Sequence, residues 1–265
     1  MNNITAEDRK RVKSMGFLSN KDGEHFSVRL ITENGVMTAE QMRNVCEMAE
    51  KFGNGNISFT TRLTVELPGI KYEDIDAVRE NAAKANIATG GTGAKIRPVV
   101  ACKGTVCVFG LIDTQGLATE IHKRFYEGYI DVKLPHKFKI AVGGCPNNCV
   151  KPSLNDFGII GQNIYNKENK TSIRGYKVYI GGRWGRSYRI GTPIEKVFEH
   201  DEVLDILEKT ILFFRENGYS GERFGSTIDR LGAENVINTI LNDDILKRKE
   251  IILTADLKTN PVINK

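Results

Sequence analysis

The feature that most constrains this chain is a glycine-rich turn that carries two cysteines. Residues 137–149 read Lys-Phe-Lys-Ile-Ala-Val-Gly-Gly-Cys-Pro-Asn-Asn-Cys. The stretch 138–142 predicts a short strand, and the two glycines that follow it predict a tight turn at its end. Cys145 and Cys149 therefore lie on a loop delivered by a strand, which indicates a site rather than a piece of scaffold.

A second loop repeats this arrangement upstream. The short apolar run at 98–101 precedes a glycine-containing loop with Cys102 and Cys107. Four of the five cysteines thus fall in two close pairs, which indicates that they act together as soft sulfur ligands. The fifth, Cys46, occupies an apolar position of a helix predicted at 41–52, so we expect it to be buried and without chemistry.

Three kinds of site are open to four paired cysteines. Disulfides need an oxidising compartment, but the chain shows no apolar signal-peptide region and no run of about 18 apolar residues, so we expect a reduced, cytoplasmic protein with no membrane contact. Structural zinc takes cysteine pairs two to four residues apart and stays open. A 4Fe-4S cluster also takes four thiolates, and glycine loops let backbone N–H groups approach the sulfurs.

The same residues resemble the sulfite and nitrite reductases that couple a 4Fe-4S cluster to siroheme. The likeness covers residues 20 to 230 approximately, and it rests on five short motifs: Ser27-Val-Arg29, Thr61-Arg62, the Cys102–Cys107 pair, Lys137-Phe-Lys139, and Gly144-Cys-Pro-Asn-Asn-Cys149. Family members usually have Cys-x5-Cys as the first pair, so this loop is one residue short. The resemblance implies that Cys102, Cys107, Cys145 and Cys149 hold the cluster, and that Cys149 also bridges to the siroheme iron.

The resemblance also implies an activity. It is the multi-electron reduction of a small oxyanion, with sulfite to sulfide favoured over nitrite to ammonia because of the Lys-Phe-Lys motif and the small size of the chain. No flavin or nicotinamide fingerprint is present, so we expect an external electron donor such as ferredoxin or a reductase subunit. Two alternatives stay open: a 4Fe-4S electron-transfer protein of the same fold without siroheme, and a structural zinc module that binds nucleic acid.

Basic residues supply the remaining site predictions. The resemblance implies that Arg29, Arg62, Lys137 and Lys139 surround the open face of siroheme, where cations bind the oxyanion and supply protons. Taken singly, each could instead lie on a solvated strand face. Three further arginines are expected to bind the carboxylates of siroheme, since guanidinium pairs with carboxylate through two parallel hydrogen bonds, and the glycines of residues 181–186 would admit a flat macrocycle. They are Arg97, Arg183 and Arg186; the alternative for residues 181–186 is a surface turn.

The charge of the chain does not single out a nucleic-acid partner. The net charge is +5 and the pI is about 8.8, but acidic residues are interspersed with the basic ones and no basic block stands alone. We therefore expect no nucleic-acid binding, and the excess positive charge suits an acidic cofactor or an acidic electron donor. His122 and His136 are interpreted as ordinary surface or core residues.

Hydrophobic periodicity predicts four segments. Residues 1–20 form an N-terminal arm with a helix capped by Thr5, and residues 21–90 follow a β-α-β-β-α order with a turn at Pro68-Gly69. Beyond a glycine-rich hinge at 90–93, residues 91–218 alternate strands and helices, include a strand at 188–190, and end in an amphipathic helix stopped by Gly218. Residues 219–265 form a C-terminal helical segment and tail. The resemblance identifies a ferredoxin-like half-domain followed by a nitrite/sulfite reductase hemoprotein α/β domain, so the fold class is α+β.

The number of copies of this unit predicts an assembly. Longer members of the family carry two copies whose basic residues converge on one siroheme, whereas this chain shows one. A half-domain with about three strands also exposes a sheet edge that needs a partner. We therefore expect a homodimer in which Arg29 or Arg62 serves the siroheme of the partner chain.

Overall fold

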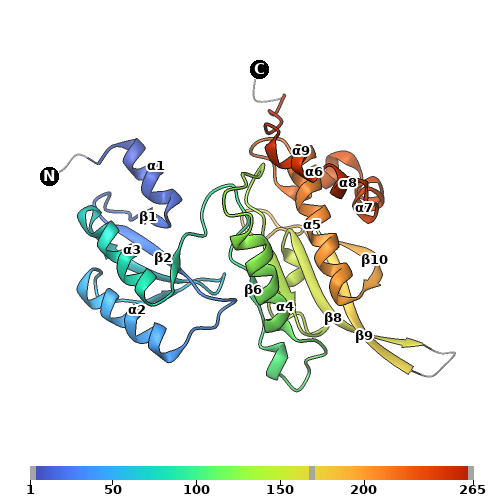
Figure 1. Ribbon diagram of the computed structural model, residues 1–265, viewed down its shortest axis with the longest axis horizontal. Coiled ribbons are helices and arrows are strands. Elements are labelled where there is room, and N and C mark those ends of the chain that lie inside the picture. Colours follow the sequence, from blue (N-terminus) through green and yellow to red (C-terminus); the bar gives the residue numbers. More distant parts are fainter. Residues whose placement is uncertain (1–3, 167–170, 262–265) are drawn as a thin grey trace. The chain divides into compact units, whose positions relative to one another are not determined.

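The computed structural model describes residues 4–166 and 171–261. The chain forms two compact units, Met1–Gly93 and Ala94–Lys265, each with its own sheet (Figure 1). The first unit ends at the glycine-rich stretch 90–93. Each unit is described by itself below.

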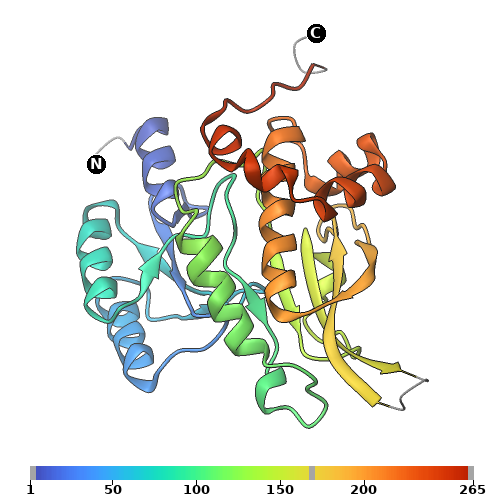
Figure 2. The ribbon, with the colours of Figure 1, turned by 45° about the vertical axis from the view of Figure 1, so that its right-hand side comes forward.

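The first unit is an antiparallel sheet packed against helices. Its strand order is β1-β2-β4-β3, with β5 also paired to β2. The strands are β1 (Phe17–Ser19), β2 (Phe26–Ile31), β3 (Ser58–Phe59), β4 (Val65–Ile70) and β5 (Ala88–Thr89), and the helices are α1 (Ala6–Ser14), α2 (Ala39–Lys51), the short 3₁₀ turn η1 (Tyr72–Asp74) and α3 (Ile75–Lys84). Helices α2 and α3 lie side by side in Figures 1 and 2 and contact each other. Apolar residues from the sheet and helices form one core.

Local signals in the sequence explain where the first two helices begin. At α1, the Thr5 side chain accepts the Asp8 N–H at 3.1 Å and the Asp8 carboxylate accepts the Thr5 N–H at 3.1 Å. At α2, Thr38 and Gln41 form the same reciprocal cap. Helix α1 is anchored in this unit because Val12 lies in its core. The division into four segments stays a prediction.

Two local predictions in the first unit are wrong. Pro68 and Gly69 lie inside β4 rather than in a turn, at a register shift in the pairing with β2, and such an irregularity tolerates the missing N–H of proline. Cys46 is exposed rather than buried. The buried stripe of α2 runs through Val45, Met48 and Ala49, so the helical phase turns Cys46 out of the core.

The second unit contains a mixed five-stranded sheet of order β10-β9-β8-β7-β6. Strands β6, β7 and β8 are parallel to one another, while β8–β9 and β9–β10 are antiparallel. The strands are β6 (Val100–Ala101), β7 (Ile140–Gly143), β8 (Phe157–Asn166), β9 (Thr171–Ile180) and β10 (Thr192–Phe198). Helix α4 (Thr114–Ile121) packs against β6 and β7, and α5 (His200–Asn217) packs against β9 (Figure 2). All four residues of β7 are buried.

Four further helices follow α5 and contact it, which gives the second unit its own helical layer. They are α6 (Phe224–Leu231), α7 (Ala233–Leu241), α8 (Asp244–Lys247) and α9 (Lys249–Thr254). Gly218 caps α5, as the sequence predicted. None of the helices in the described part of the chain has the length and apolar character needed to cross a membrane.

One prediction in the second unit is wrong, and helix α4 changes its geometry at its end. Residues 188–190 are not a strand, since only an isolated bridge joins Arg183 and Arg189, and the edge strand is β10 instead. Helix α4 ends at Ile121, and residues 122–127 continue as one wider π-helical turn (η3, His122–Glu127). The sequence did not predict β10 because Pro193 lies near its start, and proline is uncommon inside strands. Its pairing with β9 is also interrupted by a register shift.

Candidate functional site

The two cysteine loops meet because two parallel strands end side by side. Ala101 of β6 is in register with Val142 of β7, so the loops that follow leave the sheet at the same edge. The Cys102 N–H continues the ladder by donating to the Val142 carbonyl at 3.1 Å. The Gly144 N–H then donates to Cys102 Sγ at 3.2 Å, which joins the two loops directly at a sulfur atom.

The first loop is docked onto the start of α4. Thr114 donates its hydroxyl to the Cys102 carbonyl at 2.7 Å and accepts the Thr105 N–H at 3.2 Å. Asp113 caps α4 by accepting the Gly116 N–H at 2.9 Å, and it also accepts the Thr105 hydroxyl at 2.6 Å. These bonds, with that of Thr105 the largest influence, lower the pKa of Asp113. These bonds fix the loop around the short 3₁₀ turn η2 (Gly104–Val106) to the start of α4.

The close approach of the two loops requires glycine at position 144. A Cβ atom there would lie 2.9 Å from the Gly104 Cα and 3.5 Å from Cys102 Sγ. Any larger residue would push the backbone of one cysteine loop away from the other. The Gly-Gly turn that marked this stretch in the sequence thus serves the contact between the loops.

The second loop reverses direction at two residues with left-handed backbone. Asn148 has φ of 55° and donates its N–H to the Cys145 carbonyl at 3.3 Å, and Lys151 has φ of 51° just before the 3₁₀ turn η4 (Pro152–Leu154). The Oδ1 atom of Asn148 is buried and has no hydrogen-bond partner among the described residues. Asparagine tolerates this backbone region better than most residues, which accounts for its place in the loop.

All four paired cysteines are free thiols. Cys102, Cys107 and Cys145 are half-buried and Cys149 is exposed. Within the described ranges, no group of three or more His, Cys, Asp or Glu side chains is close enough to hold a single metal ion. Four thiols on two joined loops, with a backbone N–H that donates to one of the sulfurs, are a donor set that fits an iron–sulfur cluster.

The Lys-Phe-Lys motif lies just before β7. Phe138 is fully buried between Phe214 and Phe224, with ring centroids 5.9 Å and 5.7 Å away. Because side chains alternate along an extended segment, Lys137 and Lys139 point to the face opposite this aromatic cluster. Both lysines are half-buried.

A buried ion pair supports this segment. The Asp156 carboxylate is fully buried and accepts two hydrogen bonds from Arg223 Nη2, at 3.0 Å and 2.9 Å. The same carboxylate accepts the Lys139 N–H at 2.9 Å. Burial is the main influence on Asp156 and raises its pKa, while Arg223 opposes that shift. Sequence reasoning missed both members of this pair, although an acidic residue just before a predicted buried strand is a usable signal.

Four cationic or titratable side chains lie close enough to influence one another electrostatically, and we call them the basic cluster: Arg97, His136, Lys137 and Arg223. Burial lowers the pKa of Lys137, and the nearby Arg223 and Arg97 lower it further. Burial also lowers the pKa of His136 to about 4, with Arg223, Lys137 and Arg97 adding to the effect. His136 is therefore neutral near pH 7, and its Nδ1 accepts the Lys137 N–H at 2.7 Å.

The loop with Arg183 and Arg186 is largely exposed. Its glycines serve packing within the chain: a Cβ on Gly182 would lie 2.4 Å from the Ser153 carbonyl oxygen. The expectation that these glycines make room for a macrocycle is therefore not needed to explain Gly182. Arg183 Nε is buried and has no hydrogen-bond partner in the described part of the chain, which fits a bound carboxylate.

Arg29 and Arg62 belong to the first unit, whereas the cysteines and the basic cluster belong to the second. Arg29 is tied to Glu66 through Nε at 2.8 Å and Nη2 at 2.6 Å, and its Nη1 donates to the Gly91 carbonyl at 2.8 Å. Arg62 lies in the turn between β3 and β4, not in a strand as the sequence suggested. Its N–H donates to Thr60 Oγ1 at 3.2 Å.

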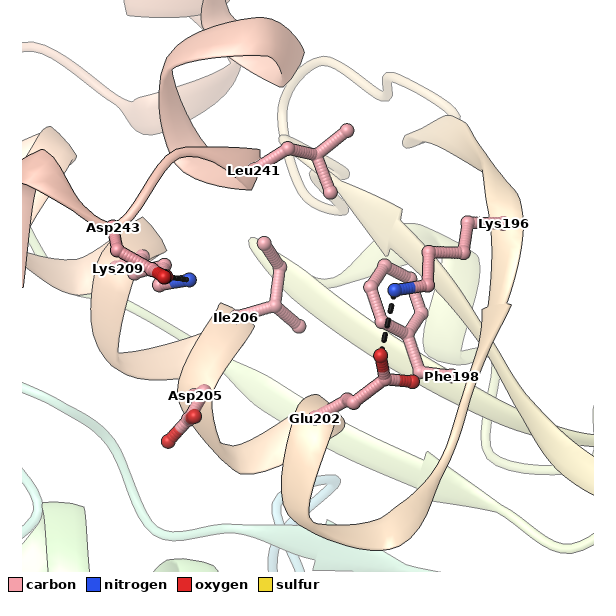
Figure 3. A pocket seen from close by; sticks show the side chains of 8 residues that line it. All are labelled: Lys196, Phe198, Glu202, Asp205, Ile206, Lys209, Leu241 and Asp243. Atoms are coloured by element: carbon pink, nitrogen blue, oxygen red, sulfur yellow. Dashed lines mark hydrogen bonds and ion pairs between the residues drawn. The ribbon is translucent and has the colours of Figure 1, made fainter.

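One pocket, of about 250 Å³, lies apart from all predicted site residues (Figure 3). It is formed by β10, α5 and the end of α7. Its two ammonium groups are already paired, Lys196 with Glu202 at 2.7 Å and Lys209 with Asp243. Its lining has two lysines against three acidic side chains, Glu202, Asp205 and Asp243, so it offers no excess positive charge to an oxyanion. This pocket therefore does not compete with the cysteine loops as the candidate site.

Comparison with known proteins decides the family. The model of the nitrite and sulphite reductase 4Fe-4S domain matches residues 92–248, and the model of the nitrite/sulfite reductase ferredoxin-like half domain matches residues 19–85. The chain belongs to the nitrite and sulfite reductase family. Members of this family are oxidoreductases that bind a 4Fe-4S cluster and siroheme. The family assignment made from the cysteine motifs and the α+β fold class are both confirmed.

Individual relatives differ greatly in length. The chain is 30% identical to a nitrite reductase [NAD(P)H] of Bacillus subtilis, and the match covers 87% of this chain but only 26% of that protein. It is 25% identical to an assimilatory-type sulfite reductase of Nitratidesulfovibrio vulgaris, with 85% of this chain and 97% of that protein covered. The solved structure of the Mycobacterium tuberculosis NirA protein has the same fold, with a TM-score of 0.75 at 18% identity over 98% of this chain and 49% of that chain.

Proposed function

We propose that this protein reduces sulfite to sulfide, or nitrite to ammonia, at a siroheme coupled to a 4Fe-4S cluster. The observation that carries the proposal is the meeting of the two cysteine loops at the ends of β6 and β7, where the Gly144 N–H bonds Cys102 Sγ. The basic cluster in the same unit supplies the positive charge that an oxyanion requires.

Each predicted site residue has a role in this proposal. Cys102, Cys107, Cys145 and Cys149 would hold the cluster, and the exposed Cys149 would also be the thiolate that siroheme shares. Arg97, Arg183 and Arg186 would bind the carboxylates of siroheme, and the buried Nε of Arg183 is the best supported of these contacts. When bound, the two groups would pass electrons from the external donor to the substrate.

The residues of the chain supply charge and protons. Reduction of an S–O or N–O bond consumes several protons, and an ammonium group both binds the anion and donates a proton to the departing oxygen. Burial and the neighbouring guanidinium groups lower the pKa of Lys137, which makes its ammonium a stronger acid than that of an ordinary lysine. Lys139 lies on the same side of the segment and acts with it.

The electron donor is a separate protein. The name of the Bacillus relative includes NAD(P)H, but that protein is far longer than this chain, which has no nicotinamide fingerprint. A ferredoxin or a reductase subunit in the cytoplasm is the proposed source, since the positive net charge favours an acidic partner.

We propose a homodimer as the working assembly. The support is that the chain carries one copy of the half-domain and one of the cysteine-bearing domain. The sheet-edge argument from the sequence is weaker than expected, because the sheet has five strands and its edge strands β1, β3 and β5 are only two or three residues long. Such short edges need no partner. Arg29 or Arg62 would then serve the siroheme of the partner chain.

The absorption spectrum of protein purified without oxygen tests this function. We expect a Soret band together with a near-red band of the reduced porphyrin type, and reduction of sulfite by a chemical electron donor. A broad brown shoulder alone would favour the electron-transfer protein without siroheme. A colourless protein loaded with zinc would contradict both iron-containing alternatives.

Replacing the two lysines separates catalysis from cofactor binding. Lys137→Ala and Lys139→Ala should each lower turnover by about 10-fold or more while the spectrum stays unchanged, because each removes a proton donor and a charge without touching a thiol. Lys133→Ala is the matched control, since Lys133 is exposed in the loop before the same segment. Steady-state kinetics of the three variants measure these effects. Unchanged turnover in both test variants would show that the two lysines have no catalytic role and lie on a solvated face.

A further inference from the structure

The loop between α5 and α6 contacts the Lys-Phe-Lys motif from outside the sheet. We call residues 219–224, which include Phe224 as the first residue of α6, the α5–α6 loop, and residues 135–139 the lysine segment. The Gly221 N–H donates to the Pro135 carbonyl at 2.9 Å, which fixes the start of the lysine segment. No sequence motif had given this C-terminal region a role.

The middle of the lysine segment is held by aromatic packing. The ring of Phe224, at the end of the α5–α6 loop, lies 5.7 Å from the ring of Phe138, and both side chains are fully buried. Phe214 of α5 completes the group. Because Phe138 is held on this side, its two lysine neighbours are directed to the other.

The end of the lysine segment is held by a buried ion pair. Arg223 of the α5–α6 loop bonds the Asp156 carboxylate, and that carboxylate accepts the Lys139 N–H. Three contacts of different kinds therefore fix the start, middle and end of the same five residues.

The α5–α6 loop is itself well fixed. The Glu222 carboxylate accepts the Tyr219 N–H at 2.9 Å and the Thr227 hydroxyl at 3.1 Å. Arg230 of α6 adds two further bonds to Glu222, at 3.0 Å and 2.8 Å. These bonds fix the loop to α6, so the loop can in turn hold the lysine segment in one position.

Stability alone is a poor explanation for the Asp156–Arg223 pair. Burying two charges costs solvation free energy that a similar apolar packing would avoid. The Nε atom of Arg223 is also buried without a hydrogen-bond partner in the described ranges, and an unsatisfied buried donor is unfavourable. The charges that face Lys137 are those of Arg97, Arg223 and Asp156, with the neutral His136 beside them, so both members of the pair act on that ammonium group together with Arg97.

We propose that the α5–α6 loop positions the lysine segment for oxyanion reduction, with Arg223 and Asp156 as the positioning residues. The effect on turnover rests on the proposed reductase function, but the positioning contacts do not. The experiment therefore needs one readout that does not depend on activity.

Chemical labelling of Lys137 gives that readout. The holoprotein is treated with an amine-reactive reagent over a range of pH, and mass spectrometry measures the labelling rates of Lys137 and of the exposed reference Lys133. Arg223→Gln should slow labelling of Lys137 at pH 8 by about 3-fold to 10-fold relative to Lys133, since loss of a nearby positive charge raises the pKa of the amine and leaves less of it neutral. Arg223→Lys, which keeps the charge, should stay within about 2-fold of the wild type.

A double variant covers the case of poor folding. Arg223→Gln leaves Asp156 buried without its counter-charge, whereas Asp156→Asn with Arg223→Gln removes both charges together. Labelling of Lys137 should still be slower in the double variant, because Arg223 influences that lysine more than Asp156 does. Arg248→Gln is the matched control, since Arg248 forms an exterior ion pair with Glu216 and should leave labelling unchanged.

Kinetics then separate this proposal from the reductase function. In an active enzyme, Arg223→Gln should lower kcat/KM for sulfite by about 10-fold at the optimum and move the alkaline limb of the pH profile to higher pH, because the Lys137 ammonium persists longer. Unchanged Lys137 labelling in Arg223→Gln and in the double variant would overturn the positioning role, whatever the activity. If Arg223→Gln slows labelling of Lys137 but the wild-type protein reduces neither sulfite nor nitrite, the positioning role stands and the proposed function is rejected.

Discussion

Replacing Cys149 by serine should remove siroheme, most of the 4Fe-4S cluster and all reductase activity. Cys149 is the exposed member of the four paired cysteines, which suits a thiolate shared between a cluster and a second iron. Serine offers a hard oxygen ligand where soft sulfur is required, so it should hold neither the cluster nor the siroheme iron firmly. Anaerobic spectra, iron and acid-labile sulfide content, and sulfite reduction measured on the same sample report all three losses.

Cys46→Ser is the matched control for this prediction. Cys46 is also exposed, but it lies on α2 of the first unit, away from the core stripe of that helix. Its replacement should change neither the spectrum nor the activity. Retention of a native-like spectrum and turnover in Cys149→Ser would show that the assignment of the cluster ligands is wrong.

The cysteine loops could be predicted from sequence because their placement follows from local rules. Each pair comes directly after a short apolar run, and parallel neighbouring strands deliver the loops after them to one edge of the sheet. The glycines marked the turn, and the structure shows why position 144 needs one. Helix caps such as Thr5 and Thr38 are equally local signals.

The supports of the site could not be found in the same way. Asp156 and Arg223 are 67 residues apart, and neither belongs to a periodic pattern that points to the other. The sequence predicts a strand at Arg62, but the structure has a turn there, between β3 and β4. Such contacts depend on how elements pack, and packing is decided by the whole chain rather than by a local window.

The second prediction with a large expected effect is that the protein is a homodimer. It is tested first by the mass of the holoprotein and then by the activity of mixed dimers. Light scattering on the holoprotein should report about twice the 29.6 kDa chain mass, as expected for a closed two-fold dimer. A monomer with full siroheme occupancy and full activity at nanomolar concentration would contradict the proposal. A partner subunit of different sequence that completes the site would contradict it as well.

Mixed dimers then show whether Arg62 acts across the interface. Arg62 is used for this test because it lies in the turn between β3 and β4, whereas Arg29 lies inside β2 and its ion pair with Glu66 joins two strands of the sheet. Arg62→Ala and Cys149→Ser homodimers should each be inactive or nearly so. A mixed dimer contains one site with intact cysteines from the first chain and an intact Arg62 from the second, so random mixing should restore about a quarter of wild-type activity.

The matched control for the mixing experiment is Arg79→Ala. Arg79 is an exposed arginine of the same unit that pairs with Asp76 across one helical turn, and its loss should leave the homodimer fully active. If Arg62 instead serves the cysteines of its own chain, every site in the mixed dimer lacks one essential residue and mixing restores nothing. Restored activity in the Arg62→Ala and Cys149→Ser mixture therefore requires two chains that build one site together, which is the arrangement that a single copy of each domain predicts.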